Sequence, residues 1–191
     1  MSDIDQIVSG CRAGEPQAFA ALFRRFEQRV YDLACVILRD PIEAQDAVQE
    51  TFVRVWERID SFAGTAAFET WLISIAVNHC RDRLRRRKVR QVLSLSGLRL
   101  SSSRRDPAAM LEEKLFQDAL WQMVNQLDDR LRLPFILRYR YDYSCGEVAD
   151  ILGLAVNTIY EQLSRARRQL RQMAEESMPS ENQANLLFKK L

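Results

Sequence analysis

The sequence has few residues of the kinds that metal binding and acid–base catalysis need. Its 191 residues include one histidine, His79, and four cysteines, none of them in a CxxC pair. A zinc site needs clustered ligands, and only His79 and Cys80 are neighbours. Adjacent residues of a helix point about 100° apart, so this pair is a poor chelate. We therefore expect reduced thiols packed in a core, no metal, no cofactor and no enzyme activity.

Long hydrophobic runs and a secretion leader are also missing. No apolar segment approaches the roughly 18 residues that cross a bilayer. Residues 1–5 are acidic, whereas a signal peptide begins basic and continues apolar. We expect a cytoplasmic protein that does not insert into a membrane.

Glycine and proline are scarce, which favours helices. The chain has 6 Gly and 5 Pro, and hydrophobic residues, 47% of the total, recur with helical spacing instead of strict alternation. We expect an all-α fold, with Pro16, Pro41 and Pro107 each opening a helix. The expected helices cover about 3–12, 16–39, 41–59, 68–90 and 107–126, followed by one that Asp128 or Asp129 caps and Pro134 bends.

The composition changes after residue 90. The segment 91–107 is rich in serine and has the polar character of a flexible linker. We therefore expect two small helical domains, at 1–90 and 108–175, joined by this linker. Residues 176–191 then form a C-terminal tail.

Positive charge is small overall but concentrated in two blocks. The net charge is +2, yet residues 81–90 hold seven basic residues and one acidic residue. Residues 161–171 hold four basic residues and one acidic residue, so the rest of the chain is acidic. Two basic blocks indicate two contacts with a polyanion, although a solvated helix face has the same pattern.

Residues 144–171 have the pattern of a helix-turn-helix. Ser144 and Glu147 form a capping box, and Gly153 ends the short helix that follows. In the second helix an apolar stripe leaves a polar face outward, where Asn, Gln and Arg can bond to base edges. An ordinary helical hairpin remains the alternative. The stripe consists of Val156, Ile159, Leu163, Ala166 and Leu170, and the outward face of Asn157, Thr158, Glu161, Gln162, Ser164, Arg165 and Arg168.

A helical wheel over residues 41–59 separates two faces. The inward face consists of Ala44, Ala47, Val48, Thr51, Val55 and Ile59, and the outward face of Asp46, Gln49, Glu50, Val53 and Glu57. An acidic face containing an apolar residue suits a protein partner with a basic surface and not DNA, because like charges repel. A plain solvated face is the alternative.

Residues 68–90 combine a polar stripe with aromatic neighbours. The stripe is Thr70, Ser74, Asn78, Arg81 and Arg85, and the aromatic residues are Phe62, Phe68 and Trp71. Cationic groups beside exposed rings suit single-stranded DNA, on whose bases the rings stack. Each ring also fits a core, and His79 is expected to be buried.

Together these residues resemble the sigma factors of bacterial RNA polymerase. The segment QETFVRVW at 49–56, followed by FETWL at 68–72, is similar to their promoter-melting domain. The helix-turn-helix is similar to their last domain. Having only these two domains is typical of the extracytoplasmic-function (ECF) group.

The resemblance implies partners and site residues. The partners are core RNA polymerase, through the clamp helices of its largest subunit and the flap of its second-largest, promoter DNA, and an anti-sigma factor. The implied polymerase-binding residues are Asp46, Gln49, Glu50 and Val53. The implied residues for the minus-ten element are Phe62, Phe68, Trp71, Asn78, Arg81 and Arg85. Those for the minus-thirty-five element are Asn157, Thr158, Tyr160, Glu161, Ser164, Arg165 and Arg168.

Two departures from the family pattern concern upstream recognition. Residues 160–162 read Tyr-Glu-Gln where the family often has Lys or Arg, and Ala155 replaces a capping Ser or Thr. We expect weaker phosphate contacts there or an unusual upstream sequence. Two other functions stay open, a free-standing helix-turn-helix regulator and a small metal- or thiol-dependent enzyme using Cys35, His79 and Cys80.

Overall fold

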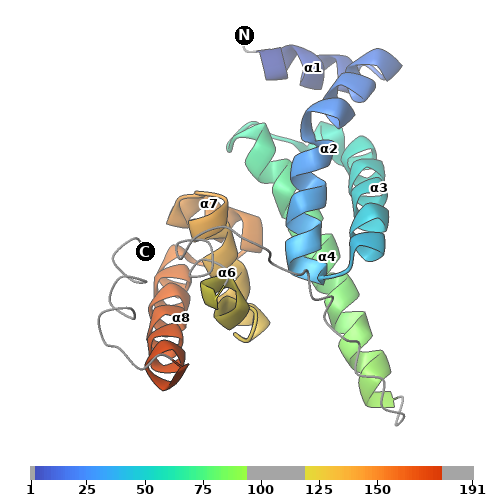
Figure 1. Cartoon of the computed structure of the whole chain (residues 1–191). Coiled ribbons are helices and arrows are strands. Elements are labelled where there is room, and N and C mark those ends of the chain that lie inside the picture. The colour runs from blue at the N-terminus through green and yellow to red at the C-terminus, as the bar shows by residue number, and fades with distance from the viewer. Residues whose placement is uncertain (1–2, 94–118, 178–191) are drawn as a thin grey trace, which may run out of the picture. The chain divides into compact units, whose positions relative to one another are not determined.

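The computed structural model describes residues 3–93 and 119–177, and every regular element in these ranges is a helix (Figure 1). The chain forms two compact units, one N-terminal and one mainly C-terminal. The N-terminal helices are α1 (Asp3–Arg12), α2 (Pro16–Leu38), α3 (Pro41–Arg58), the 3-10 helix η1 (Ile59–Ser61) and α4 (Phe68–Leu93). The C-terminal helices are a segment at 119–124, α6 (Asp129–Arg140), α7 (Cys145–Leu152) and α8 (Val156–Ser177). The predicted all-α fold with two helical parts is confirmed.

The N-terminal helices begin where the sequence signals predicted. Pro16 and Pro41 each open a helix, since proline lacks the N–H that the first turn leaves unused. Asp40 caps α3, because its Oδ1 accepts hydrogen bonds from the amides of Ile42 and Glu43 at 2.9 and 3.1 Å. Arg39 ends α2 in a left-handed conformation, with φ 59°.

Helices α2, α3 and α4 pack against one another, and α1 packs across α2 (Figure 1). Side chains such as Leu22, Val30 and Leu72 fill the core. The C-terminal half of α4 extends beyond α2 and α3, and none of residues 81–89 is buried. Helix α4 ends three residues later than predicted, at Leu93, and the rest of the predicted linker lies outside the described residues.

In the C-terminal part, α6 packs on α8. Asp128 caps α6, because its Oδ1 accepts from the amide of Arg130 at 2.9 Å. Pro134 lies inside α6, as predicted, and is buried. Of the predicted tail, only residues 176 and 177 are described, and they belong to α8. No helix in the described part of the chain is long and apolar enough to span a membrane.

Candidate functional site

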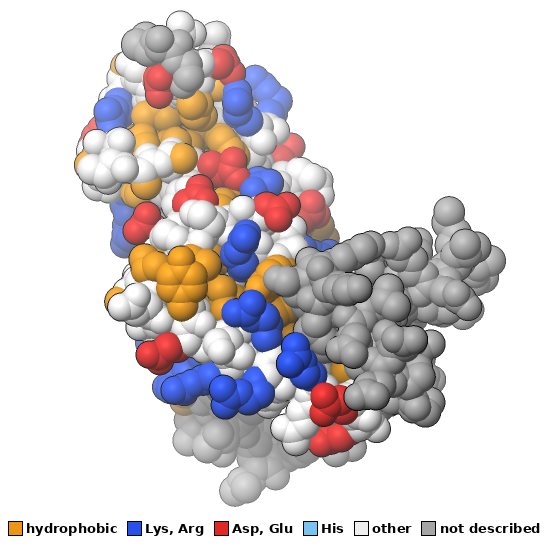
Figure 2. Space-filling view, turned by 90° about the vertical axis from the view of Figure 1, so that its left-hand side faces the viewer, with side chains coloured by type: hydrophobic (Ala, Val, Ile, Leu, Met, Phe, Trp, Pro, Cys, Tyr) orange, Lys and Arg blue, Asp and Glu red, His pale blue; other side chains and the backbone are white. Residues whose placement is uncertain are grey.

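Apolar side chains that remain exposed mark the surfaces most suited to partners. On the face drawn in Figure 2, hydrophobic side chains form separate patches between charged ones, and Lys and Arg group toward the lower part of the view. Exposed apolar surface costs free energy in water unless a partner covers it. Among the described residues, the large exposed hydrophobic ones are Ile42, Val53, Trp56, Val89, Leu154, Val156 and Tyr160.

Helix α3 presents the acidic face that the helical wheel predicted. The opposite face is buried, with Ala44, Ala47 and Val55 at 0% exposure. The outward residues are Asp46, Gln49, Glu50 and Val53, and all are exposed. We call these four residues the acidic face. An acidic surface with an apolar residue in it can bind a protein that offers basic and apolar groups.

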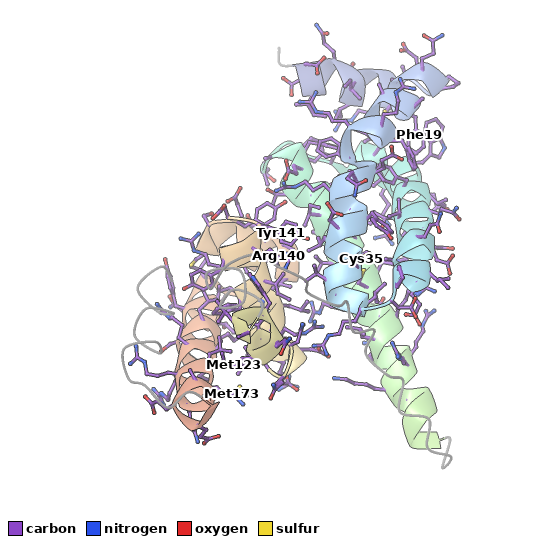
Figure 3. All side chains as sticks on the ribbon, in the orientation of Figure 1. Phe19, Cys35, Met123, Arg140, Tyr141 and Met173 are labelled. Atoms are coloured by element: carbon purple, nitrogen blue, oxygen red, sulfur yellow. The ribbon has the colours of Figure 1, made fainter. Side chains whose placement is uncertain are left out.

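Two contacts border the acidic face, and neither was predicted from the sequence. Trp56 is 43% exposed, and its ring meets that of Phe19 edge-on with centroids 5.0 Å apart. Phe19 is labelled on α2 in Figure 3. The spacing of three residues between Trp56 and Val53 was the available signal. Arg83 of α4 reaches the face through an ion pair, with its Nη2 3.3 Å from Oδ2 of Asp46.

Aromatic rings gather where the loop 62–67 joins α4. The Phe62 centroid lies 5.4 Å from that of Trp71 and 5.2 Å from that of Phe68. Phe62 and Trp71 are partly exposed, whereas Phe68 is 6% exposed and also packs on Phe26. The prediction that Phe68 itself contacts DNA is therefore corrected, because its ring supports the other two from the core. Phe62 and Trp71 form a surface on which unstacked bases can stack.

The polar stripe of α4 continues from these rings. Asn78, Arg81 and Arg85 are all exposed, as predicted. Arg81 Nη1 donates to Asn78 Oδ1 at 3.4 Å, and Arg85 Nη2 lies 3.2 Å from Asp82 Oδ1. Thr70 was predicted in the same stripe but is buried at 2% exposure, so the stripe begins further along the helix. Exposed guanidinium groups beside exposed rings can hold a phosphate backbone.

The capping box of the helix-turn-helix is present. The Ser144 amide donates to Oε2 of Glu147 at 2.8 Å, and the Glu147 amide donates to Oγ of Ser144 at 3.2 Å. Gly153 follows α7 with φ 64°, a conformation that glycine adopts without strain. These two features fix where α7 starts and stops.

A first prediction concerns this cap. Hydrogen bonds from the amide and then the hydroxyl of Ser144 lower the pKa of Glu147. These hydrogen bonds to the Glu147 carboxylate stabilise the folded state fully above the ordinary Glu pKa of about 4.3. Their contribution is lost as the pH falls through the lower pKa of Glu147 in the folded protein. We expect Ser144→Ala to reduce the free energy of unfolding by about 1 kcal/mol at pH 7. Thermal unfolding at pH 7 and at about pH 2 checks this: the deficit should be smaller at the lower pH, where the Glu147 carboxyl is protonated, and an equal deficit at both values would contradict it.

Helix α8 presents its polar face outward. Ile159, Leu163 and Leu170 are buried, whereas Val156 was predicted in that stripe and is 40% exposed. The first turn of α8 is thus less covered than the wheel predicted. Among the predicted contact residues, Thr158 is partly exposed, and the exposed ones are Asn157, Tyr160, Glu161, Ser164, Arg165 and Arg168. Hydrogen-bonding and cationic side chains on one exposed helix face fit a DNA groove.

The surroundings of His79 and Cys80 disfavour the charged forms of both side chains. His79 is 6% exposed, and burial, then the charges of Arg54 and Arg83, lower its pKa, which favours the neutral ring. Burial raises the pKa of the Cys80 thiol to about 12, so the nucleophilic thiolate is disfavoured. All four cysteines are free; Cys11 and Cys80 are buried, and Cys35 and Cys145 partly exposed. Within 3–93 and 119–177, no three His, Cys, Asp or Glu residues are placed to hold a metal ion.

Comparison with known proteins assigns both parts of the chain. The sigma-70 region 2 family matches residues 22–90, and the sigma-70 region 4 family matches residues 117–170. The ECF sigma-E factor of Salmonella typhimurium is 31% identical over 174 residues, which cover 85% of this chain and 90% of that protein. The chain is an ECF sigma factor. SigW of Bacillus subtilis is similar at 29% identity, covering 88% of this chain and 95% of its own length.

Solved structures of sigma factors share the fold. RpoE from Bartonella quintana, solved with the anti-sigma factor NepR, has a TM-score of 0.65 and 26% identity. It covers 82% of this sigma factor, which in turn covers 96% of that chain. CnrH, solved with the cytosolic domain of CnrY, has a TM-score of 0.65 at 24% identity and covers 92% of this chain and 100% of its own. As a sigma factor, the protein directs RNA polymerase to promoters.

Proposed function

We propose that this sigma factor binds core RNA polymerase through the acidic face of α3 and opens promoter DNA with the surface around Phe62, Trp71 and α4. The observation that carries the proposal is that the N-terminal unit offers two exposed surfaces of different chemistry. One is acidic and includes an apolar residue, Val53, and the other is aromatic and basic. The first repels DNA and suits a protein, and the second suits melted DNA.

Strand opening on this surface needs binding energy and no covalent chemistry. Flipping a base out of the stack costs a few kcal/mol. Stacking on aromatic side chains returns roughly 1–3 kcal/mol per base, and phosphate contacts with Arg81 and Arg85 add salt-dependent affinity. Phe62 and Trp71 are the stacking surface in this proposal, and Asn78 offers hydrogen bonds. The protein is therefore a binding factor with no cofactor, and not an enzyme.

Helix α8 reads the minus-thirty-five element in the major groove. The exposed residues from Asn157 to Arg168 would face the bases and the flanking phosphates. Holding both DNA contacts on one polymerase raises the effective concentration of the second contact once the first is made. This arrangement favours promoters that carry both elements over DNA that carries only one of them.

An anti-sigma factor is the regulator that we propose. RpoE, 26% identical with a TM-score of 0.65, is solved with an anti-sigma factor bound. A regulator that covers the acidic face of α3 would prevent polymerase binding by occupying its surface. Since RNA polymerase is a cytoplasmic enzyme, we place the action of this sigma factor in the cytoplasm.

A second prediction tests the function directly. Core RNA polymerase supplemented with the protein is expected to start transcription on genomic fragments of the source organism at positions that core alone ignores. Sequencing of transcript 5′ ends maps these start sites. A free-standing regulator would instead bind specific duplex DNA tightly without polymerase. Tight duplex binding by the protein alone, together with no new start sites, would contradict the proposal.

A further inference from the structure

Helix α1 carries an arginine that reaches across to the loop 62–67. Arg12 is the last residue of α1, and its Nη2 donates a hydrogen bond to the carbonyl oxygen of Phe62. Its Nε donates to the carbonyl oxygen of Ile59 at 3.5 Å. The centre of the guanidinium group lies 5.9 Å from the centroid of the Phe62 ring. One side chain thus contacts the backbone on both sides of the turn and the exposed ring itself.

The turn at residues 59–62 directs two carbonyl groups toward Arg12. The Phe62 amide donates to the Ile59 carbonyl oxygen at 3.2 Å, which closes the 3-10 turn before the loop. Gly64, two residues on, has φ 72°, a conformation that gives the loop a sharp change of direction. The planar guanidinium carries five N–H donors in fixed directions, so it can bond two carbonyl groups and stack on a ring together. A lysine has neither the planar fork nor the stacking face.

The contact of Arg12 with the loop affects the position of the Phe62 ring more than the free energy of unfolding. Arg12 is exposed, and exposed polar contacts contribute little to the free energy of unfolding. The loop it holds, however, carries one of the two rings on which a base would stack. A ring held in place before DNA arrives loses less freedom when it binds.

We propose that Arg12 is a positioning residue for strand opening. It holds the carbonyl groups of Ile59 and Phe62 and so keeps the Phe62 ring beside Trp71, ready to receive an unstacked base. This inference rests on the proposed function of the Phe62–Trp71 surface. It gives α1 a role in promoter opening although α1 itself need not touch DNA.

The test is binding of single-stranded DNA by the holoenzyme. The probe is a non-template oligonucleotide covering the region upstream of a start site mapped as above, with 2-aminopurine substituted at successive positions. Arg12→Gln is expected to weaken binding roughly two- to tenfold, the effect of having to order the Phe62 ring when DNA binds, and to lower the fluorescence change at one position. Arg12→Lys is expected to restore little of the loss. Core-polymerase affinity and the melting temperature should stay as in the wild type.

Two matched controls separate this role from general damage. Arg24→Gln removes an exposed arginine of α2. Arg25→Gln breaks the ion pair with Asp3 that joins α1 to α2; the Arg25 guanidinium also lies 6.0 Å from the centroid of the Phe26 ring, which packs on Phe68, but within the described part of the chain it has no hydrogen bond to the loop. Both are expected to bind the oligonucleotide as the wild type does. Equal losses in Arg25→Gln and Arg12→Gln would overturn the proposal, because the effect would then come from loosening α1.

A double variant decides whether Arg12 acts through Phe62. If it does, Arg12→Gln combined with Phe62→Ala binds no more weakly than Phe62→Ala alone. Additive losses overturn the proposal. If Phe62→Ala and Trp71→Ala bind normally, the proposed melting surface fails, and the role of Arg12 fails with it. If these two variants lose binding while Arg12→Gln does not, only the role of Arg12 is overturned.

Discussion

Replacing Asp46 and Glu50 together with arginine is expected to abolish binding to core RNA polymerase. Both side chains belong to the acidic face and are exposed, so a basic partner can reach them. Reversing their charge turns two attractions into repulsions, and like charges brought together at an interface cost several kcal/mol. Because each 1.4 kcal/mol changes affinity tenfold, we expect a loss of at least about a hundredfold.

The fold should survive this change. Neither residue belongs to the buried face of α3, and the ion pair of Asp46 with Arg83 is exposed, with 59% of the Asp46 side chain accessible. Such pairs contribute about 0–1 kcal/mol. Asp46→Arg does place two cations together, so Glu50→Arg alone is the cleaner variant and should lose part of the affinity.

Binding is measured by titrating core polymerase into the fluorescently labelled protein, with circular dichroism and melting temperature as checks on the fold. Asp32→Arg is the matched control for Glu50→Arg alone, since each changes the charge by two at an exposed position, here on α2. It should leave the affinity close to that of the wild type. Unchanged affinity in the well-folded double variant would mean that the acidic face does not contact polymerase.

Local signals in the sequence were sufficient for most helix ends and for the two faces of α3. A proline after an acidic cap and the Ser144–Glu147 capping box act within one turn of helix. Tertiary packing therefore does not change where they start a helix. A helical wheel also separates faces reliably when one face is fully covered, as α2 and α4 cover that of α3.

The helical wheel was wrong where the burial of a side chain depends on neighbouring helices. Thr70 lies near the start of α4 and is 2% exposed, although the wheel placed it in the outward stripe. A wheel gives direction but not how far a neighbouring element extends, so it mistook Thr70 for an exposed residue. Val156 shows the reverse error, since it is 40% exposed in the first turn of α8. For Phe68 the core position that the sequence left open is the one observed, because the rings of Phe26 and Phe62 lie against it.

The contact of Arg12 with the loop could not be read from the sequence at all. Arg12 and Phe62 are 50 residues apart, and only the packing of α1 beside η1 brings them together. The ion pair between Asp46 and Arg83 spans 37 residues and joins two helices in the same way. No periodicity or spacing within one element carries information about such pairs.

Glu161→Arg in α8 is expected to change the base that the sigma factor prefers in the upstream element. The Glu161 side chain is 71% exposed and lies 4.0 Å from Arg165. A carboxylate only accepts hydrogen bonds, so in the major groove it can bond the amino groups of cytosine or adenine and no acceptor of guanine. An arginine there bonds guanine O6 and N7 instead. We expect a preference for guanine of roughly 5- to 150-fold, the effect of 1–3 kcal/mol.

The same substitution should also strengthen upstream binding and its dependence on salt. Glu161 repels the phosphates that flank the groove, and its removal frees Arg165 to contact them. Each added phosphate contact steepens the slope of log affinity against log salt by about 1. Glu161→Gln separates the two effects, because it removes the charge but can still bond adenine through its amide.

Holoenzymes with each variant are mixed with duplexes randomised across the upstream segment, and the bound molecules are sequenced at two salt concentrations. Glu175→Arg is the control, an equal charge change at an exposed position about 21 Å further along α8. It should alter the salt dependence little and the base preference not at all. A Glu161→Arg holoenzyme that selects the same bases as the wild type would show that this residue does not face the base edges. In that case other residues of α8 contact the bases.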